Sequence, residues 1–331
     1  MEEVRIILNQ ISILTLLGLI GFIAGKTNYL PQNAGTIISR VVVKLTAPLL
    51  IFITLAKRDF SVGNLSSILG VYILGLAFLM MTFVIGSLGC KILKLEGATA
   101  NIYKMHSMFG NVVYLAYPLL TSLFGDDGLF YGVIFAIAND TLLWTLGIFL
   151  VSKHKKTSWK ENIKHLINGN TVALCSGLTV LIIKMLFGQW LGNLPLVYQV
   201  SGFIYDTFDL LGSTTFPLSM LFIGLILSEI KIDKISDFIK RTHIIVLALF
   251  KLIIVPVLAL IILSFTGDWI DTIAKYVIVL QLAVPCGTIV PALAAEYGSD
   301  YQTGTENVFV TIVLGILTMP LIVYLMQIII K

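Results

Sequence analysis

Long apolar stretches separated by short polar segments run through the whole chain. Each stretch is close to the length of about 20 residues that a membrane-spanning helix needs. Strands of a membrane barrel are excluded, because they alternate apolar and polar residues over only about 10 positions. The pattern therefore predicts an all-α membrane protein with ten transmembrane helices, at 4–25, 34–56, 66–90, 99–124, 129–151, 169–188, 197–228, 242–265, 271–297 and 304–330.

The first apolar stretch is predicted to be a true membrane helix rather than a cleaved signal peptide. Glu2 and Glu3 make its start acidic, and no small-residue cleavage site follows it. The longest polar segment is rich in lysine and lies in the middle of the chain at 152–168. It divides the sequence into a first five-helix repeat at 1–151 and a second at 169–331.

The composition agrees with a chain that lies in a lipid bilayer. Of its 331 residues, 57% are hydrophobic and only 12% are charged, and the mean hydropathy is +0.97. Soluble domains carry about 25% charged residues. A soluble enzyme, a nucleic-acid-binding domain and a disordered protein are thereby excluded. Cys90, Cys175 and Cys286 lie in apolar segments without a paired spacing, so they are expected to be small hydrophobic residues rather than metal ligands or a disulfide.

Lysine and arginine are distributed unevenly between the two sides of the predicted membrane protein. With ten helices, both termini lie on one side, together with the loops after the second, fourth, sixth and eighth helices. That side holds few basic residues, among them Lys57 and Arg58, whereas most lysines fall on the other side. Cytoplasmic loops carry the excess of Lys and Arg. The distribution therefore predicts a multi-pass protein of the cell membrane with both termini extracellular and the loop at 152–168 cytoplasmic.

The two halves of the chain share a pattern of residues. The fourth and ninth helices match when Pro118 is placed on Pro291, and the second and seventh helices share a proline in a similar apolar context. The same alignment pairs Gly125 with Gly298 and Asp127 with Asp300. Because each half contains an odd number of helices, the halves are inserted in opposite senses. Inverted repeats of this kind recur in secondary transporters, which bind their substrates between the repeats.

The fourth and ninth helices carry helix-breaking residues near their middle. Gly110 and Pro118 bracket a short stretch in the fourth, and Pro285, Gly287 and Pro291 interrupt the ninth. Proline removes a helical hydrogen bond, and unpaired backbone in a membrane is tolerated only inside protein or beside a watery cavity. The restarting half-helices offer free N–H groups and a partial positive charge, which together favour an anion. The alternative is a pair of ordinary proline kinks without a ligand.

Three motifs resemble the auxin efflux carrier family, which includes plant PIN proteins and bacterial permeases of malate or malonate. They are FGNVVYLAYPL at 109–119, AIANDTLLWTLG at 136–147 and LAVPCGTIVPALAAEYG at 282–298. The start of the sixth helix is also similar, although the family often has proline after the asparagine where this chain has Thr171 after Asn170. The resemblance spans the whole chain.

The resemblance implies two inverted five-helix repeats whose fourth and ninth helices cross at their proline breaks. It also implies elevator-type alternating access, with helices 3–5 and 8–10 moving against helices 1, 2, 6 and 7, and it suggests a homodimer. The short central loop resembles the bacterial members, which disfavours auxin as the native substrate. The bile-acid/sodium symporter group is similar in plan and is an alternative.

Candidate site residues follow from the breaks and from polar groups at membrane depth. Asp140 is either a protonatable coupling site or the partner of a lysine, and His106 is either a proton relay or a polar residue at the cytoplasmic boundary. Lys44 and Lys251 either neutralise a carboxylate or extend to an interface. The candidates for substrate binding are Asn111, Val112, Tyr114, Pro118, Asn139, Pro285, Cys286, Gly287, Thr288 and Pro291. The candidates for coupling or charge neutralisation are Asp140, Lys44, Lys251, Glu296 and His106.

The predicted function is a secondary carrier of small organic anions, most simply mono- or dicarboxylates, driven by a gradient of H⁺ or Na⁺ or by the membrane potential alone, and without another cofactor. A sodium-coupled symporter and a cation/proton antiporter are alternatives. An antiporter would need carboxylates at the crossing, and none lies between Gly110 and Pro118 or between Pro285 and Pro291. An intramembrane enzyme is disfavoured because the histidines are scattered and no nucleotide or metal motif occurs. A sensor would need a soluble domain, for which no segment is long enough.

Overall fold

A computed structural model describes residues 2–58, 65–152, 169–192, 195–229 and 242–330 of the chain. These residues are helical throughout, except for turns, short extended stretches and one isolated bridge between two residues. The helices are α1 (Glu2–Lys26), α2 (Ala34–Val41), η1 (Val42–Thr46), α3 (Ala47–Ala56), α4 (Leu65–Ile92), α5 (Gly97–Met108), η3 (Val112–Ala116), α6 (Tyr117–Leu142), η4 (Leu143–Gly147), α7 (Ile148–Val151), α9 (Gly169–Gly192), α10 (Pro195–Ser213), α11 (Thr215–Glu229), α13 (Thr242–Leu249), η5 (Phe250–Ile254), α14 (Val255–Ser264), η6 (Gly267–Trp269), α15 (Thr272–Ala283), α16 (Ile289–Tyr297) and α17 (Tyr301–Ile329).

The prediction of an all-α membrane protein is confirmed. Seven helical stretches of the described chain are long and apolar enough to cross a membrane, from Ala34–Ala56 to Tyr301–Ile329. Two further apolar helices, Ser12–Lys26 and Thr272–Ala283, are shorter. One of the seven, Val112–Val151, is 40 residues long and is bent at Gly125, whose φ is 59°. The second half of the fourth predicted helix and the whole of the fifth thus form one continuous helical stretch with a sharp bend.

Four short π-helical segments interrupt the long helices, and proline explains three of them. Each of these three segments ends two residues before a proline: η1 before Pro48, η3 before Pro118 and η5 before Pro256. Because proline has no N–H to donate and its ring crowds the carbonyl one turn earlier, the preceding turn widens into a π segment. These helices therefore bend without ending.

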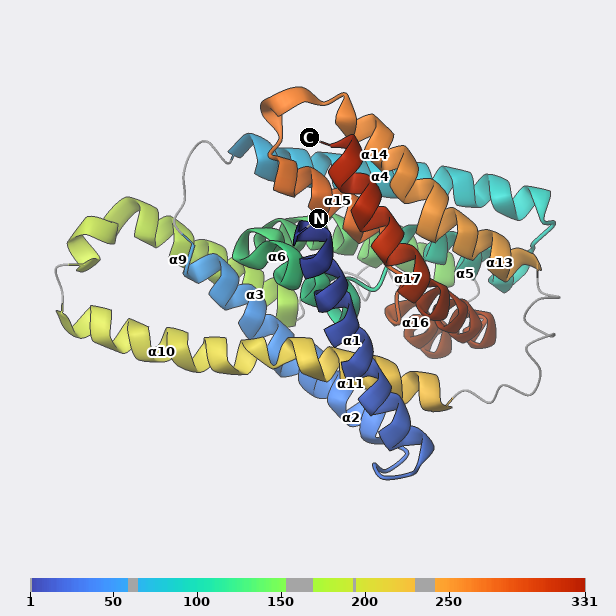
Figure 1. Ribbon diagram of the computed structural model, residues 1–331, viewed down its shortest axis with the longest axis horizontal. Helices are drawn as coiled ribbons and strands as arrows, with labels where there is room; N and C mark the ends of the chain where they lie inside the picture. The colour runs from blue at the N-terminus through green and yellow to red at the C-terminus, as the bar shows by residue number, and fades with distance from the viewer. Residues whose placement is uncertain (1, 59–64, 153–168, 193–194, 230–241, 331) are drawn as a thin grey trace.

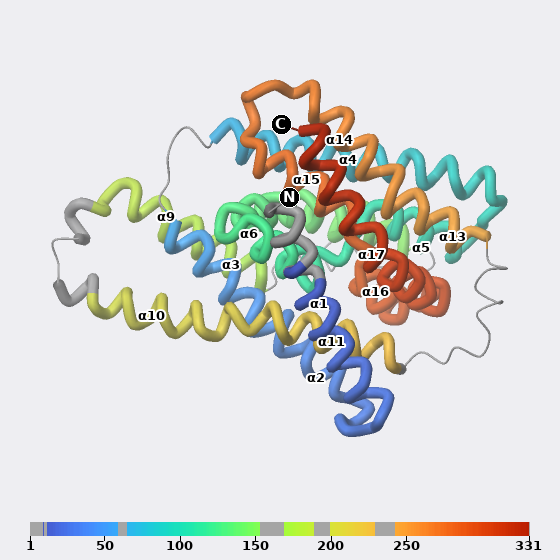
Figure 2. The backbone as a smooth tube through the Cα atoms, viewed as in Figure 1, coloured from blue at the N-terminus to red at the C-terminus, as the bar shows by residue number. Residues whose placement is uncertain are grey.

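The helices pack in two groups, which Figures 1 and 2 show from the same side. The smaller group contains α1, the continuous α2–η1–α3, α9, α10 and α11. The larger group contains α4, α5, α6 to α7, α13, α14, α15, α16 and α17. The segment from η3 into α6 lies between them, because it contacts both α11 and the helices of the larger group. The two groups have the composition that the family resemblance implies for the static and moving parts.

Helices α1 and α11 approach each other closely through glycine. A Cβ atom at Gly21 would lie 2.4 Å from the Leu221 carbonyl oxygen, and one at Gly224 would lie 1.9 Å from the Gly18 oxygen. Gly25 faces Ser228 in the same interface. Small residues at such spacing allow membrane helices to pack backbone to backbone. The glycines of α1 are thus used inside the chain, and a homodimer stays a prediction from the family resemblance.

Parts of the sequence on which the orientation was predicted lie outside the described residues. They include 153–168 of the basic central loop and the lysine-bearing segment 230–241. The assignment of the two membrane sides therefore stays a prediction.

Candidate functional site

The interruptions of the two proline-containing helices meet in the middle of the larger group. α5 ends where the backbone becomes extended, and α15 ends in the same way. The two extended segments pair antiparallel, because the Asn111 N–H donates to Pro285 O at 2.9 Å and the Gly287 N–H donates to Phe109 O at 3.0 Å. The pairing satisfies backbone groups that would otherwise be costly inside a membrane. The broken segments therefore hold each other in place.

Glycine allows this close crossing. A Cβ atom at Gly287 would lie 2.8 Å from Gly110 O, and one at Gly110 would lie 2.6 Å from a methyl carbon of Val284. On the far side, a Cβ atom at Gly315 would lie 2.8 Å from the Pro285 ring. Any larger residue at Gly287 would push against backbone, which cannot move away cheaply.

Backbone donors within the interruptions have partners in the protein. The N–H groups of Asn111 and Gly287 bond across the crossing, and the Cys286 N–H donates to Thr311 Oγ1 at 3.0 Å. These three donors are therefore not available to an anion. The free N–H groups predicted from the sequence belong to the starts of the half-helices η3 and α16, and their role toward an anion stays a prediction.

Lys251 lies at the crossing and does not extend to an interface. Its side chain is 2% exposed, and its Nζ donates to Met108 O at 3.1 Å. Met108 is the last residue of α5, so the ammonium group faces the partial negative charge at the C-terminal end of that half-helix. The described residues give Lys251 no carboxylate partner. The interpretation as an interfacial lysine is wrong, and a neutralising role at the crossing is what the geometry allows.

His106 is buried beside the crossing, so its interpretation as a boundary residue is also wrong. Its ring is fully enclosed, with Nδ1 3.1 Å from Asn307 Nδ2 and Nε2 3.4 Å from Gly287 O. An amide nitrogen can only donate, so Nδ1 accepts and Nε2 carries the proton. The sequence placed His106 near the start of a long helix, but α5 has only 12 residues. His106 therefore lies in its last turn, at the crossing.

A polar cavity lies beside the first interruption. Its volume is about 160 Å³, and Asp140, half-buried, is the only acidic side chain that lines it. The remaining walls come from η3, α3, α6, η4 and α9. They are Ile51, Val112, Val113, Tyr117, Val133, Ala136, Ile137, Thr141, Trp144, Asn170, Thr171 and Leu174.

Two amide groups lie near this carboxylate, those of Asn139 and Asn170. Asn139 Nδ2 donates to Asp140 Oδ1 at 3.3 Å, and Asn170 lines the cavity opposite. Among the described residues, Asn139 Oδ1, Asn170 Oδ1 and Asn111 Nδ2 are buried without a hydrogen-bond partner. Buried polar atoms without a partner are rare and call for a ligand, water or ion. No described lysine or arginine pairs with Asp140, so the predicted lysine partner is not found there.

Tyr114 connects the first interruption to the smaller group. Its hydroxyl lies 2.7 Å from Ser39 Oγ in α2, and its ring centre lies 4.4 Å from that of Phe222 in α11. The side chain is therefore held by residues of the opposite group. Sliding of one group along the other would have to break these contacts.

The remaining candidates lie away from the polar cavity. Lys44 is exposed on η1, and Glu296 is exposed near the C-terminal end of α16. Thr288 is half-buried at the start of α16, and Pro291 is buried against Gly304 of α17. The structure thus brings Val112 and Asp140 together at the cavity, with Asn111 and Asn139 next to them in the chain.

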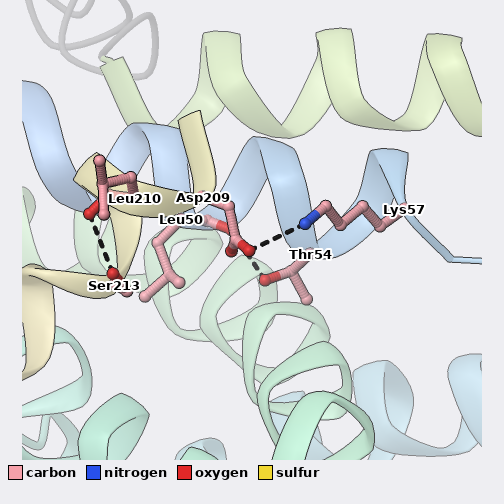
Figure 3. A network of polar contacts seen from close by, with 6 residues as sticks. All are labelled: Leu50, Thr54, Lys57, Asp209, Leu210 and Ser213. Carbon is pink, nitrogen blue, oxygen red and sulfur yellow. Dashed lines mark hydrogen bonds and ion pairs between the residues drawn. The ribbon is translucent and has the colours of Figure 1, made fainter. Parts of the chain in front are cut away.

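Two more cavities border the same interrupted helix. An apolar cavity of about 290 Å³ lies between α1, α11, α17 and residues Leu115 and Leu119. A larger one of about 520 Å³, here called the vestibule, has Tyr117 and Pro118 in its wall. Figure 3 shows several of its lining residues, among them Lys57, just after α3, which pairs with Asp209 of α10 at 2.8 Å. The vestibule is lined by Leu50, Ile53, Thr54, Lys57, Arg58, Tyr117, Pro118, Thr121, Ser122, Asp126, Leu129, Asp209, Ser213, Thr215 and Phe216.

Several residues of this region were not predicted. Asn307 and Thr311 are four residues apart on α17, so one face of a helix presents both to the crossing. That spacing of polar residues within an apolar helix is a signal that the sequence carries. Tyr117 and Arg58 carry no such signal, because their roles depend on how α3 and α6 pack together.

Comparisons with known proteins agree with a membrane transporter. A family model described as "Membrane transport protein" matches residues 6–323. An uncharacterized transporter of Methanocaldococcus jannaschii is 24% identical over 314 residues, which cover 95% of this chain and 97% of the relative. An uncharacterized transporter of Methanothermobacter thermautotrophicus is 21% identical over 315 residues, which cover 94% of this chain and 95% of the relative.

Proposed function

The chain belongs to the membrane transport protein family, the auxin efflux carrier family of the sequence resemblance, and from that premise we propose that it is a secondary carrier of small organic anions. Membership makes it a multi-pass membrane transporter and not an enzyme. The proposed substrates are mono- or dicarboxylates, of the kind carried by malate or malonate permeases. They would bind at the polar cavity beside the crossing.

The proposed architecture has ten membrane crossings arranged as two inverted repeats. Gly125 and Gly298, which the sequence alignment pairs, both have positive φ values, of 59° and 68°. In both halves such a glycine follows the interrupted helix, which supports a common ancestor for the two halves. The bend at Gly125 lets the 40-residue stretch Val112–Val151 serve as two crossings. We keep the predicted orientation, with both termini outside and the central loop in the cytoplasm.

Elevator-type movement is proposed from the division into two helix groups. The crossing lies wholly within the larger group, whereas the polar cavity lies between α6 of that group and α3 and α9 of the smaller one. A substrate held there would be carried when the larger group slides along the smaller. Tyr114, which touches Ser39 and Phe222, is the contact that such a movement would remake.

One observation carries the proposed coupling: Asp140 lines the polar cavity and has no cation partner among the described residues. A carboxylate at this depth is costly as an isolated charge, so a proton or a bound cation must accompany it. When protonated, it can donate a hydrogen bond to a substrate carboxylate. The Asn111 and Asn139 amides supply further hydrogen-bonding groups, and H⁺ is therefore the proposed coupling ion.

The same observation favours one alternative function. The case against a cation/proton antiporter was the lack of carboxylates within the two interruptions. Asp140 lies outside both but shares a cavity with Val112 and Val113 of the first interruption. An exchange of Na⁺ for H⁺ at Asp140 is therefore the second candidate function.

Uptake by reconstituted liposomes distinguishes the organic-anion carrier from the sodium/proton antiporter. In the proposed function, an inward proton gradient drives accumulation of radiolabelled malonate or malate. Asp140→Asn abolishes this drive, and Asn111→Ala or Asn139→Ala lowers uptake by about tenfold, the order expected for one lost hydrogen bond to a charged group. Thr207→Ala, an exposed change on α10, is the control and leaves uptake unchanged. Sodium–proton exchange without transport of any organic anion would instead establish the antiporter.

A further inference from the structure

The vestibule is a cavity with two basic residues, Lys57 and Arg58, and two acidic residues, Asp126 and Asp209, in its wall; Lys57 and Asp209 pair with each other, which leaves Arg58 as the basic group for an anion. It is about 520 Å³ in volume, which is within the usual range of small-molecule sites. Lys57 and Arg58 follow the C-terminal end of α3, and Tyr117 separates the vestibule from the polar cavity, since it lines both. A ligand in the vestibule would therefore lie one side chain away from the proposed transport site.

The backbone that carries Arg58 is fixed from the neighbouring helix α9. Lys184 Nζ donates to the carbonyl oxygens of Ala56, Lys57 and Arg58, at 3.2, 3.3 and 3.2 Å. These are the last carbonyls of α3 and the residues just after it, where a cation is favourable. One lysine thus holds the segment that places both basic side chains.

The guanidinium group of Arg58 stacks with its flat face on the Phe130 ring, which also holds it in place. Its central carbon lies 3.9 Å from the centre of the Phe130 ring, and the side chain is only 15% exposed. Stacking of this kind leaves the N–H donors at the edge of the plane free to bond in that plane. An arginine fixed by stacking has lost its rotamer freedom before a ligand arrives, which favours binding of a planar carboxylate.

The present partner of Arg58 is weakly held. Arg58 Nη1 donates to Asp127 Oδ1 at 2.6 Å, through one oxygen only, and the Asp127 side chain is 54% exposed. Ion pairs with an exposed partner contribute little stability, because water solvates the carboxylate nearly as well. An incoming carboxylate could therefore replace Asp127 at little cost.

A second, independent feature of the vestibule points to a ligand. Thr215 lines the cavity and is fully buried, and its Oγ1 has no hydrogen-bond partner among the described residues. A buried hydroxyl normally finds a partner, so its orphaned state is unusual. The hydroxyl has no accessible surface in this structure, so it can donate to a carboxylate in the cavity only after the side chain turns toward it.

We propose that the vestibule is a second, outer binding site for carboxylate anions, in which Arg58 binds the carboxylate in place of Asp127. The site delivers substrate to the polar cavity past Tyr117. The proposal deepens the proposed function and rests on it for the identity of the ligand. Binding at the vestibule also removes one contact between the two groups, the ion pair of Arg58, just after α3, with Asp127 of α6.

Protection of an introduced thiol tests the site without any transport measurement. Thr54 lines the vestibule, and Cys175 is the only exposed native cysteine of the described chain, so the variant is Thr54→Cys with Cys175→Ser. The purified full-length protein in detergent is labelled with an anionic or a cationic methanethiosulfonate reagent, with and without malonate. The expected result is faster labelling by the anionic reagent and slower labelling when malonate is present.

Three further variants on this background decide the outcome. Arg58→Gln is expected to weaken malonate protection about tenfold, the order for one lost charge-assisted bond, and to remove the preference for the anionic reagent. Asp127→Asn is expected to strengthen protection, because the competing carboxylate is gone. Asp140→Asn, in the inner cavity, is expected to leave protection intact. Thermal unfolding of each variant first establishes that it is folded.

Protection that persists in Arg58→Gln, or no protection in the parent variant, would overturn the proposal. These outcomes are separate from failure of the proposed function. Malonate protection without organic anion uptake would retain the outer site and reject the transport role. Malonate uptake without protection would reject the outer site alone.

Discussion

Residues after the first interruption line all three cavities, whereas no residue of 284–291 lines any of them. Val112, Leu115 and Tyr117 each border open space, while Pro285, Cys286 and Gly287 are buried on all sides by protein. The two helices thus have similar sequences and a shared crossing but different surroundings. The first helix lines the cavities after its interruption, and the second packs against the first.

The packing partners explain this difference. The segment η3 faces α11 of the smaller group, so it lies at the contact between the two groups. α15 and α16 pack instead against α14, α17 and α6 within the larger group. There, glycine brings neighbouring helices close, as where a Cβ atom at Gly315 would lie 2.8 Å from the Pro285 ring. Five of the ten predicted substrate-binding residues lie on this second interruption, and the cavities indicate a supporting role for them.

Substituting Gly287 disrupts most directly the packing of the second interruption against the first. Gly287→Val places a side chain against Gly110 O, which a Cβ atom alone would approach to 2.8 Å. Overpacking against backbone should lower the free energy of unfolding by about 3 kcal/mol or more. Thermal unfolding in detergent measures the loss. Gly188→Val on α9, where a Cβ atom meets nothing within 4 Å, is the matched control and should be near neutral. Equal stability of the two variants would contradict the crossing geometry.

One valine substitution beside each interruption sharpens the comparison; the segments after the first and the second interruption are called the first and the second arm. Val113→Phe extends into the polar cavity, so uptake should fall at least about tenfold while the melting temperature stays close to that of the parent. Val290→Phe enlarges a fully buried side chain of the second arm, so it should destabilise by about 1–3 kcal/mol. Uptake and unfolding are measured on both. A destabilised Val113→Phe, or a stable and inactive Val290→Phe, would reverse the assigned roles.

The fold was largely predictable from the sequence because one signal, long apolar stretches, dominates it. Lengths and prolines located the interruptions in the fourth and ninth helices, since proline and glycine act on the local backbone. The pairing of Gly125 with Gly298 was also visible, and both prove to have positive φ. What the sequence could not provide was the depth of His106 and Lys251, because depth depends on where a half-helix ends.

The candidate site was predictable only in part, for a related reason. Asp140 and Asn139 stand out because charged and amide groups are rare within apolar helices. Which arm faces a cavity depends on contacts between distant helices, and no local pattern encodes them. Arg58 is the clearest case: its importance follows from Phe130, Asp127 and Lys184, which lie far from it in the sequence.

The hydroxyl of Thr311 on α17 stabilises the second interruption through one hydrogen bond. Thr311 Oγ1 accepts the bond from the Cys286 N–H, so Thr311→Val leaves that N–H buried without a partner. The cost of an unsatisfied buried donor is about 1–3 kcal/mol. Thr305→Val, a half-buried position on the same helix whose hydroxyl makes an exposed bond to Tyr301 O, is the control and should change stability by less than about 0.5 kcal/mol. Chemical or thermal unfolding compares the two, and equal effects would show that the Cys286 N–H does not depend on Thr311.

The smallest effect on stability is expected from the aspartates that follow the matched glycines Gly125 and Gly298, because the two aspartates have different partners. Asp300 caps α17 through Thr303 N at 3.0 Å and accepts a bond from Thr99 Oγ1 at 2.6 Å. Its partner in the alignment, Asp127, has only the exposed pair with Arg58. Asp300→Ala should therefore cost about 1 kcal/mol, as for other helix caps, and Asp127→Ala no more than about 0.5 kcal/mol.

The pH dependence of the Asp300 effect gives a second test of the cap. Partial burial raises the pKa of Asp300, but the hydrogen bonds from Thr99 and Thr303 outweigh burial and hold that pKa below its ordinary value. A carboxyl whose pKa is lowered by folding stabilises the protein above its unfolded pKa of about 3.9 and loses that contribution as the pH falls through the folded pKa. The stability difference between the parent and Asp300→Ala should thus be complete at neutral pH and shrink below about pH 4. A difference that grew on acidification would mean that the protonated acid, not the carboxylate, makes the stabilising contacts.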